Sequence, residues 1–390
     1  MYMKLLKRYC ALLLVSMGAL LLVSCSGSRA KDSKFYKDSL YTPKYASGFE
    51  ITTSEGYSSS LIRVTRPWQG EASESFELLI LRNGESAPAG YTGAVMHGDA
   101  ERIVALSSSN VAMFDALGKA STIVGVSGLD YISSPAIRKR GEQGLTRDVG
   151  YDSNLNFELL MALRPDVVLL YSVAGGNSTI TAKLTELSIP YLYIGDYAEE
   201  SPLGKAEWII AMGEICGQRE EAIKNFEACS ERYNAITKQV INSNLEHKPR
   251  IVLNTPYRDV WYLPHNNSYM VKLIKDAGGD YFYDGNTSRQ SQPISIELAY
   301  KLVSESDMWL ETGMAINSIA DLKRSIPKFA DMPPVLNNAV YNSTARTTPM
   351  GGSDFYESGV VQPDVVLADM VEIMHPDILD HELYYYKKLE

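Results

Sequence analysis

Two segments of this chain repeat the same alternation of polar and apolar positions. In the first, Glu158 stands at the start of an amphipathic helix, and Asp166 then leads into the apolar run 167–169. In the second, Glu297 stands at the start of a similar helix, and Asp307 leads into the apolar run 308–310. A unit that recurs once at domain scale predicts two similar lobes with a ligand site between them.

Apolar strands alternate with amphipathic helices through both halves of the chain. This order is typical of α/β folds, in which helices cover both faces of a mostly parallel sheet. We therefore predict two three-layer α/β lobes, over residues 99–201 and 248–390, with a ligand cleft between them. The helical tract 202–247 separates the lobes, and its apolar stripe predicts a long, rigid linker helix that resists large hinge bending.

The segment 45–98 has a different pattern. Leu61, Val64, Leu78 and Ile80 are spaced among Ser, Thr and Gly in the way expected of half-buried strands. We expect a small antiparallel β appendage attached to the first lobe.

The N-terminus has the organisation of a secretory signal. Three positive charges in the first eight residues precede an apolar run over 11–23, which is shorter than a usual membrane span. The Leu-Val-Ser-Cys tetrad that ends at Cys25 resembles the bacterial lipobox. This resemblance implies that residues 1–24 are a signal peptide and that Cys25 is lipidated; the alternative is an ordinary signal with a chance cysteine. The polar segment 25–44 then serves as a lipidated tether.

The charge of the chain argues against one broad class of partner. The sequence has 37 Lys and Arg against 47 Asp and Glu, a formal net charge of -10. The signal holds three positive and no negative charges, so its removal lowers the net charge from -10 to -13. A chain this acidic is a poor binder of nucleic acid.

Two further cysteines, Cys216 and Cys229, are expected in consecutive helices that are broken at Gly217. The helical residues between them span about 16 Å along the axis. A disulfide requires a much shorter separation. We therefore expect two buried thiols.

Several short blocks occur in order between residues 102 and 377. They are Arg102–Ser107 with Asp115–Gly118, Val149-Gly150 before Asn156, Pro165-Asp166, Ile189-Pro190, Ala277-Gly278-Gly279, and Glu297 with Asp307. Through these blocks the chain resembles the helical-backbone (class III) substrate-binding lipoproteins of ABC importers, which bind ferric siderophores, haem or cobalamin. The resemblance implies a cleft-type binding protein that works with a permease.

The resemblance also implies a role for the two repeated glutamates. In that family the acidic residue at each helix start docks into an arginine pocket of one permease subunit, and the matching positions are Glu158 and Glu297. The alternative is structural, because a carboxylate in the first turn stabilises a helix through its dipole, with Asn156 and Ser295 as N-caps. Equivalent placement in both lobes favours docking, since helix stabilisation does not require it.

The ligand site is expected on the loops that leave the carboxyl ends of the strands. Aromatic side chains there suit flat macrocycles and catecholates, and arginines suit propionates or an anionic ferric complex. Since the chain has 25 tyrosines, we expect roughly half of the loop candidates to touch ligand. We predict Trp261 and Arg258 most strongly. The ligand-binding candidates are Asn110, Tyr131, Tyr171, Tyr197, Tyr257, Arg258, Trp261, Arg289, Arg346 and Tyr356.

The sequence gives no sign of a resident metal or of catalysis. The five histidines show no paired spacing, so no dedicated metal site is predicted, although His265 could approach the cleft and a tyrosinate could bind haem iron. No nucleophile elbow, phosphate-binding loop or dinucleotide fingerprint is present. We predict a protein that is not an enzyme, with no catalytic residues and no intrinsic cofactor.

Together these observations predict a lipoprotein of the cell envelope, anchored in the membrane through its lipid and facing the periplasm. It would capture an iron chelate, either a siderophore or haem, and deliver it to an ABC permease dimer with its ATPase. A cobalamin or another corrinoid is the alternative cargo. A chelate-processing enzyme and a surface capture lipoprotein are the alternatives from other classes.

Overall fold

The computed structural model describes residues 35–70, 74–173, 175–256 and 260–390, which belong to one compact unit. Cys25 and the predicted signal peptide lie outside the described residues, as do Tyr257 and Arg258. In the part of the chain that is described, no helix combines the length and the apolar character that a membrane span needs.

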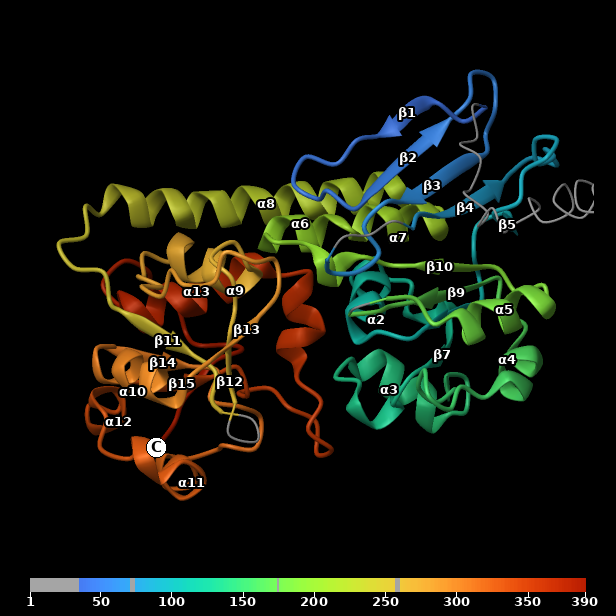
Figure 1. Cartoon of the computed structure of the whole chain (residues 1–390). Coiled ribbons are helices and arrows are strands. Elements are labelled where there is room, and N and C mark those ends of the chain that lie inside the picture. The colour runs from blue at the N-terminus through green and yellow to red at the C-terminus, as the bar shows by residue number, and fades with distance from the viewer. Residues whose placement is uncertain (1–34, 71–73, 174, 257–259) are drawn as a thin grey trace, which may run out of the picture. The chain divides into compact units, whose positions relative to one another are not determined.

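The first lobe is built on a five-stranded sheet with the strand order β10-β9-β6-β7-β8. All neighbours in this sheet are parallel, and helices connect them on both faces (Figure 1). The buried apolar runs of the sequence form the strands, as an α/β fold requires. The elements are β6 (Ile103–Ala105), α2 (Ser108–Ala116), β7 (Ile123–Val126), α3 (Pro135–Glu142), β8 (Arg147–Asp148), α4 (Phe157–Leu163), β9 (Val167–Leu170), α5 (Ser178–Glu186) and β10 (Tyr191–Tyr193).

The second lobe is built on a sheet with the strand order β11-β14-β15-β16, in which only the edge strand β16 is antiparallel. A separate hairpin pairs β12 with β13. The prediction of two α/β lobes with mostly parallel sheets is confirmed. The elements are β11 (Ile251–Leu253), β12 (Trp261–Leu263), α9 (Tyr269–Asp276), β13 (Gln292–Ile294), α10 (Ile296–Ser304), β14 (Met308–Leu310), α11 (Ile319–Ser325), α12 (Pro333–Leu336), β15 (Val340–Asn342) and β16 (Lys387–Lys388).

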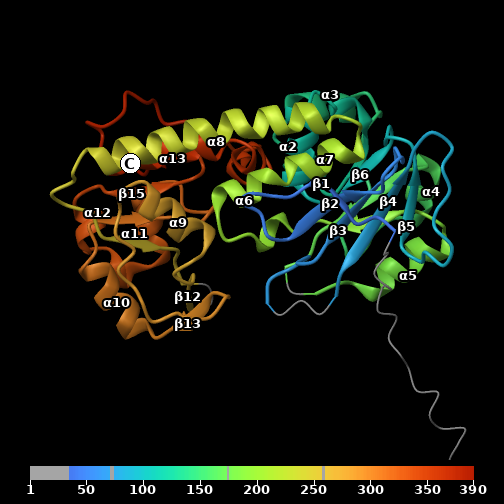
Figure 2. The same ribbon diagram turned by 90° about the horizontal axis from the view of Figure 1, so that it is seen from above.

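A long helix joins the two lobes, as the sequence predicts. After α6 (Pro202–Glu207) and α7 (Ile209–Ile215), the 24-residue helix α8 (Arg219–Asn242) runs along both lobes (Figures 1 and 2). Helix α13 (Pro363–Met374) packs against α8.

The chain also crosses between the lobes a second time. After β15, residues 343–362 return to the first lobe through the short helices η5 (Asp354–Tyr356) and η6 (Ser358–Val360). Helix η6 contacts α2 and α6 there, before α13 begins. The lobes are therefore joined by a rigid helix and by a packed crossing segment.

The N-terminal sheet has the order β1-β2-β3-β4-β5. Its first four strands are antiparallel, as expected, but β5 is parallel to β4. The first strand also starts inside the segment 25–44 that was expected to be a tether. The strands are β1 (Asp38–Tyr41), β2 (Phe49–Thr53), β3 (Ser60–Val64), β4 (Phe76–Leu81) and β5 (Ala94–His97).

A buried carboxylate explains why this early segment is ordered. Glu207 in α6 is 0% exposed. It accepts hydrogen bonds from the Tyr41 hydroxyl at 2.6 Å and from the amides of Lys44, Tyr45 and Ala46 at 2.7, 2.7 and 2.6 Å. Because each buried donor would cost free energy without a partner, this cluster fixes the segment to the first lobe.

The N-terminal sheet shares the main core of the protein. Ile51, Ile62 and Leu78 are all 0% exposed, and they belong to the same buried cluster as Trp208 and Ile210 around α7. Burial of apolar side chains stabilises the contact by about 1.5–3 kcal/mol for each large residue. The sheet is therefore part of the folded unit and more than a loose appendage.

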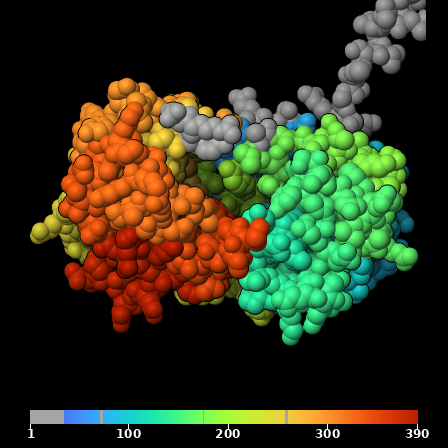
Figure 3. Space-filling model, turned by 90° about the horizontal axis from the view of Figure 1, so that it is seen from below, coloured from blue at the N-terminus to red at the C-terminus, as the bar shows by residue number. Residues whose placement is uncertain are grey.

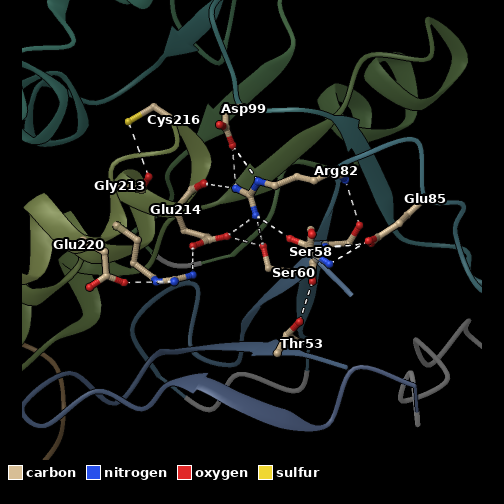
Figure 4. Close-up of polar contacts among 12 residues, drawn as sticks. Thr53, Ser58, Ser60, Arg82, Glu85, Asp99, Gly213, Glu214, Cys216 and Glu220 are labelled. Carbon is tan, nitrogen blue, oxygen red and sulfur yellow. Dashed lines mark hydrogen bonds and ion pairs between the residues drawn. The ribbon is translucent and has the colours of Figure 1, made fainter. Parts of the chain in front are cut away.

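A polar cluster fastens the same sheet to α7 and α8 (Figure 4). Arg82, just after β4, donates to Glu214 Oε1 at 2.7 Å and to the Glu214 carbonyl at 2.9 Å. Its Nε donates to Asp99 at 2.9 Å. Arg219 donates to Glu214 Oε2 at 2.8 Å. Two arginines thus neutralise one carboxylate that is only 2% exposed.

Candidate functional site

A cavity of about 650 Å³ lies between the two lobes. Figure 3 shows a hollow between the orange-red second lobe and the green first lobe. Its lining comes from loops at the carboxyl ends of strands in both lobes and from the turn that follows β3. This volume is in the range of small-molecule binding sites.

Tyrosines form much of the cavity wall. Burial raises the pKa of Tyr151, and Asp148 and Tyr131 beside it act in the same direction. Burial also raises the pKa of Tyr171 and of Tyr356. Their rings offer flat apolar faces and their hydroxyls remain protonated at neutral pH. The tyrosines that line the cavity are Tyr131, Tyr151, Tyr171, Tyr197, Tyr269 and Tyr356.

Cations lie among these rings. The ammonium group of Lys205 is 5.6 Å from the ring centre of Tyr197 and 5.4 Å from that of Tyr269, so it bridges an aromatic side chain of each lobe. Arg289 of the second lobe lies 3.8 Å from the Glu200 carboxylate of the first lobe. Because both side chains of this pair are partly exposed, the pair contributes little to stability and leaves Arg289 available to a ligand.

Two poorly solvated carboxyl groups face the cavity from opposite lobes. Asp196 is 2% exposed, and burial raises its pKa while Lys205 opposes the change. Burial also raises the pKa of Glu311. Each group therefore keeps its proton to a higher pH than usual, and can donate as well as accept a hydrogen bond over a wider range.

Glu311 is unusual in its backbone and its hydrogen bonds. It follows β14 directly with a φ of 60°, in the left-handed region that residues other than glycine seldom adopt. Its Oε2 accepts from the Ser343 hydroxyl at 2.8 Å. Its Oε1 is buried. Burial raises the pKa of this carboxyl, and the Tyr386 hydroxyl beside it acts in the opposite direction.

Five of the predicted ligand residues lie where the sequence placed them, on the cavity wall. Contact with a ligand remains a prediction for each of them. They are Tyr131, Tyr171, Tyr197, Arg289 and Tyr356.

Three other candidates lie outside the cavity lining. Asn110 is 0% exposed within α2, outside the cavity lining. Trp261 is 1% exposed, stacks on Trp309 with 5.6 Å between the ring centres, and donates from Nε1 to the Leu253 carbonyl at 2.9 Å. Arg346 pairs with Asp354 at 2.7 Å and lies over the Tyr384 ring. The cavity wall therefore includes none of these three side chains, and Tyr257 and Arg258 lie outside the described residues.

Several lining residues were not predicted as ligand contacts. Glu311 directly follows the apolar strand β14. The expectation that ligand residues follow the carboxyl ends of strands, which selected Tyr171, therefore also selects Glu311. Tyr269 and Lys205 lie on helices, where their sequence gives no such signal. Arg66 belongs to the N-terminal sheet, and only the tertiary fold brings it to the cavity.

Histidine and cysteine give no metal centre in the described residues, since no group of three or more His, Cys, Asp or Glu side chains is placed to hold an ion. His265 does line the cavity. Burial lowers its pKa, and its Nδ1 accepts from the Asn267 amide at 3.3 Å, so the ring is neutral at pH 7. Cys216 and Cys229 are both buried free thiols, as the sequence predicts.

The repeated glutamates lie at the starts of α4 and α10, which are at opposite ends of the molecule (Figure 1). Both side chains are exposed. The predicted N-caps are confirmed, because Asn156 accepts from the Leu159 amide at 2.9 Å and Ser295 accepts from the Leu298 amide at 3.2 Å. The caps satisfy the helix starts without the two carboxylates, which lie at the protein surface.

The crossing segment packs tightly against the first lobe at one end of the cavity. A Cβ at Gly352 would lie 1.9 Å from the Tyr131 carbonyl, so only glycine fits there. Glu357, which is 2% exposed, accepts from the amides of Ser133 and Ser134, both at 2.7 Å. Burial, with Asp354 and Asp115 nearby, raises the pKa of Glu357 from 4.5 to about 7.

This raised pKa predicts a pH dependence of stability. Since the folded state binds the Glu357 proton more tightly than the unfolded state, its stability should fall as the pH rises from 4.5 to about 7 and stay level above that. Glu357→Gln should remove up to about 3 kcal/mol of this change. Urea denaturation of both proteins at pH 5 and pH 8 measures it. An equal change in the two proteins would contradict the assignment.

The family and the relatives of the chain agree with this architecture. A family described as periplasmic binding protein matches residues 103–347. An uncharacterised lipoprotein of Methanocaldococcus jannaschii is 27% identical over 285 residues, which are 71% of this chain and 65% of that protein, so the chain spans just under two thirds of its relative.

Two solved structures share the fold. A periplasmic heme binding protein of Pseudomonas aeruginosa superposes with a TM-score of 0.58 at 17% identity, covering 75% of this chain and 98% of that chain. A periplasmic heme binding protein of Vibrio cholerae superposes with a TM-score of 0.53 at 19% identity, covering 68% and 98%. Since the family match covers more than half of the sequence, the chain belongs to the periplasmic binding protein family.

Proposed function

We propose that this protein captures an iron chelate, haem or a ferric siderophore, and delivers it to an ABC permease dimer with its ATPase. In this proposal Cys25 carries the lipid that anchors the protein in the membrane, on the periplasmic side of the cell envelope. The observation that carries the proposal is the cavity between the lobes, which combines six tyrosines with Arg66, Lys205 and Arg289.

The chemistry of the wall favours a flat, acidic iron complex. Tyrosine rings pack well against macrocycles and catecholates. Guanidinium groups bind carboxylates and other anions through paired hydrogen bonds. A tyrosine oxygen is also an established type of ligand to haem iron. The two similar solved proteins bind heme, which supports the same kind of cargo here.

A corrinoid is the second candidate, and a different observation favours it. The periphery of a corrinoid carries amide groups, which donate hydrogen bonds. Asp196 and Glu311 line the cavity from opposite lobes, and their carboxyl groups would accept such bonds. Haem has no comparable donors at its edge.

The test is a fluorescence titration of residues 26–390, which contain the whole described unit. Haem, a ferric catecholate, a ferric hydroxamate and cyanocobalamin are added separately, and quenching of the four tryptophans is followed. We expect one of them to saturate at one equivalent and at sub-micromolar concentration. If none of the four binds, both cargo proposals are wrong. Steady consumption of the bound chelate would instead support a processing enzyme.

A further inference from the structure

The N-terminal sheet reaches the ligand cavity at the turn after β3. Arg66, Gln69 and Gly70 line the cavity, although they precede the segment that matches the family, 103–347. We infer that residues 66–70 form a third wall of the binding site, and that Arg66 binds an acidic group of the cargo there. The inference rests on the proposed function, because the wall acts only on a cargo held between the lobes.

Backbone contacts seat one end of this wall on the first lobe. The Thr65 amide donates to the Gly48 carbonyl at 2.8 Å. A Cβ at Gly195 would lie 2.2 Å from the Arg66 carbonyl oxygen, so this approach requires glycine. Gly195 immediately precedes Asp196, a cavity residue. The wall and the first-lobe site are therefore in direct contact.

A buried carboxylate supports the wall from behind. Glu199 is 7% exposed, and it accepts hydrogen bonds from the amides of Ser47 and Gly48 at 3.0 and 2.9 Å. It also accepts from Trp208 Nε1 at 3.1 Å. Glu199 thus holds Ser47 and Gly48 beside Trp208, between α6 and α7. Because Thr65 binds Gly48, residues outside 66–70 help to fix the position of the wall.

The other end of the wall spans toward the second lobe. Trp68 is 8% exposed and packs edge-on against Tyr193 with 5.5 Å between the ring centres. The Gln69 amide donates to the Val173 carbonyl at 3.2 Å. A Cβ at Gly70 would lie 3.5 Å from Gln290 Nε2, so this end of the wall lies near the second lobe.

Two guanidinium groups, those of Arg66 and Arg289, line the cavity. Arg66 donates from Nη1 to the Ser47 hydroxyl at 2.7 Å, and no carboxylate of the described residues forms an ion pair with it. Arg289 adjoins Gln290, which lies near Gly70, and its contact with Glu200 is long, at 3.8 Å. Both arginines keep donors for a ligand carboxylate. The cargo would therefore lie with its acidic edge against residues 66–70.

The first experiment compares haem with haem dimethyl ester, whose two carboxylates are blocked. Arg66→Ala should weaken haem binding about tenfold, because a charge-assisted contact is lost. It should leave the binding of the ester unchanged, and Arg66→Lys should recover part of the loss. Arg138→Ala, which removes an exposed arginine of α3 away from the cavity, is the matched control. Equal haem affinity in wild type and Arg66→Ala would overturn the inference.

If the wild-type protein binds no haem, haem is refuted as cargo. The same variants are then titrated with an anionic ferric triscatecholate, which is a second acidic iron complex. If the wild type binds neither acidic probe, the role of Arg66 is refuted.

Hydrogen exchange tests the wall itself without any cargo. The amides of Thr65 and Gln69 should exchange on the order of a hundredfold more slowly than in an unstructured peptide, because both are hydrogen-bonded in the docked wall. Gly195→Ala should release them and leave the amides of α13 protected. If the Gln69 amide of the wild type exchanges without protection, the wall is not docked, and the inference fails even where haem binds.

Discussion

Replacing Glu158 and Glu297 together by alanine should abolish cargo uptake by cells, while the purified protein binds its cargo as before. Both carboxylates are exposed at helix starts whose caps are satisfied by Asn156 and Ser295. Neither glutamate lines the cavity. If they dock the two lobes on the two permease subunits, their loss removes the recognition of the permease and spares the ligand site. Uptake of labelled cargo and a titration of the purified variant measure the two properties.

The control has to separate docking from helix stabilisation. Glu220 and Glu221 also occupy the first turn of a helix, α8, and have no counterpart in the other lobe. Alanine at both should produce a similar small loss through the helix dipole and leave uptake unchanged. Normal uptake by the Glu158→Ala, Glu297→Ala protein would refute docking. Equal loss of uptake in both double variants would point to stability as the cause.

Glu214→Ala should lower the free energy of unfolding by about 3–5 kcal/mol, the cost of breaking a buried ion pair. The substitution removes the carboxylate that Arg82 and Arg219 share. It also removes the acceptor of the Ser60 hydroxyl in β3. The N-terminal sheet should therefore loosen first, and urea denaturation with hydrogen exchange of β3 amides would show it.

Glu220→Ala is the matched variant for this prediction. It removes the partly exposed partner of Arg219, 3.2 Å away, and leaves Glu214 in place. Exposed pairs contribute about 0–1 kcal/mol, so little change is expected. Equal losses in the two variants would mean that burial of Glu214 does not govern the stability of the cluster.

The two-lobe architecture follows from local patterns. Runs such as 167–170 and 308–310 are apolar at every position because both faces of their sheets are covered, and this signal is visible in the sequence. Helix α13 also has a local signal, because proline marks its start and most of its residues are apolar. The mostly polar helix α3 and the three-residue strand β15 give no comparable signal in the sequence.

The sequence could also place residues that stand directly after strands. Tyr171 and Tyr197 line the cavity because the carboxyl ends of parallel strands meet at one edge of the sheet. The same reasoning failed for Trp261, since β12 pairs with β13, about thirty residues further along, and this pairing turns the indole into the core. Only the pairing partner decides which side of a strand faces inward.

By itself, then, the sequence determined the class of fold, the repeated lobes, the capped glutamates and much of the aromatic wall, because these depend on neighbouring residues. The tertiary structure alone decided that Glu207 and Glu199 order the chain near residues 41–48, and that Arg66 reaches the cavity. Contacts between residues more than a hundred positions apart create these features, and no local pattern of side chains encodes such contacts.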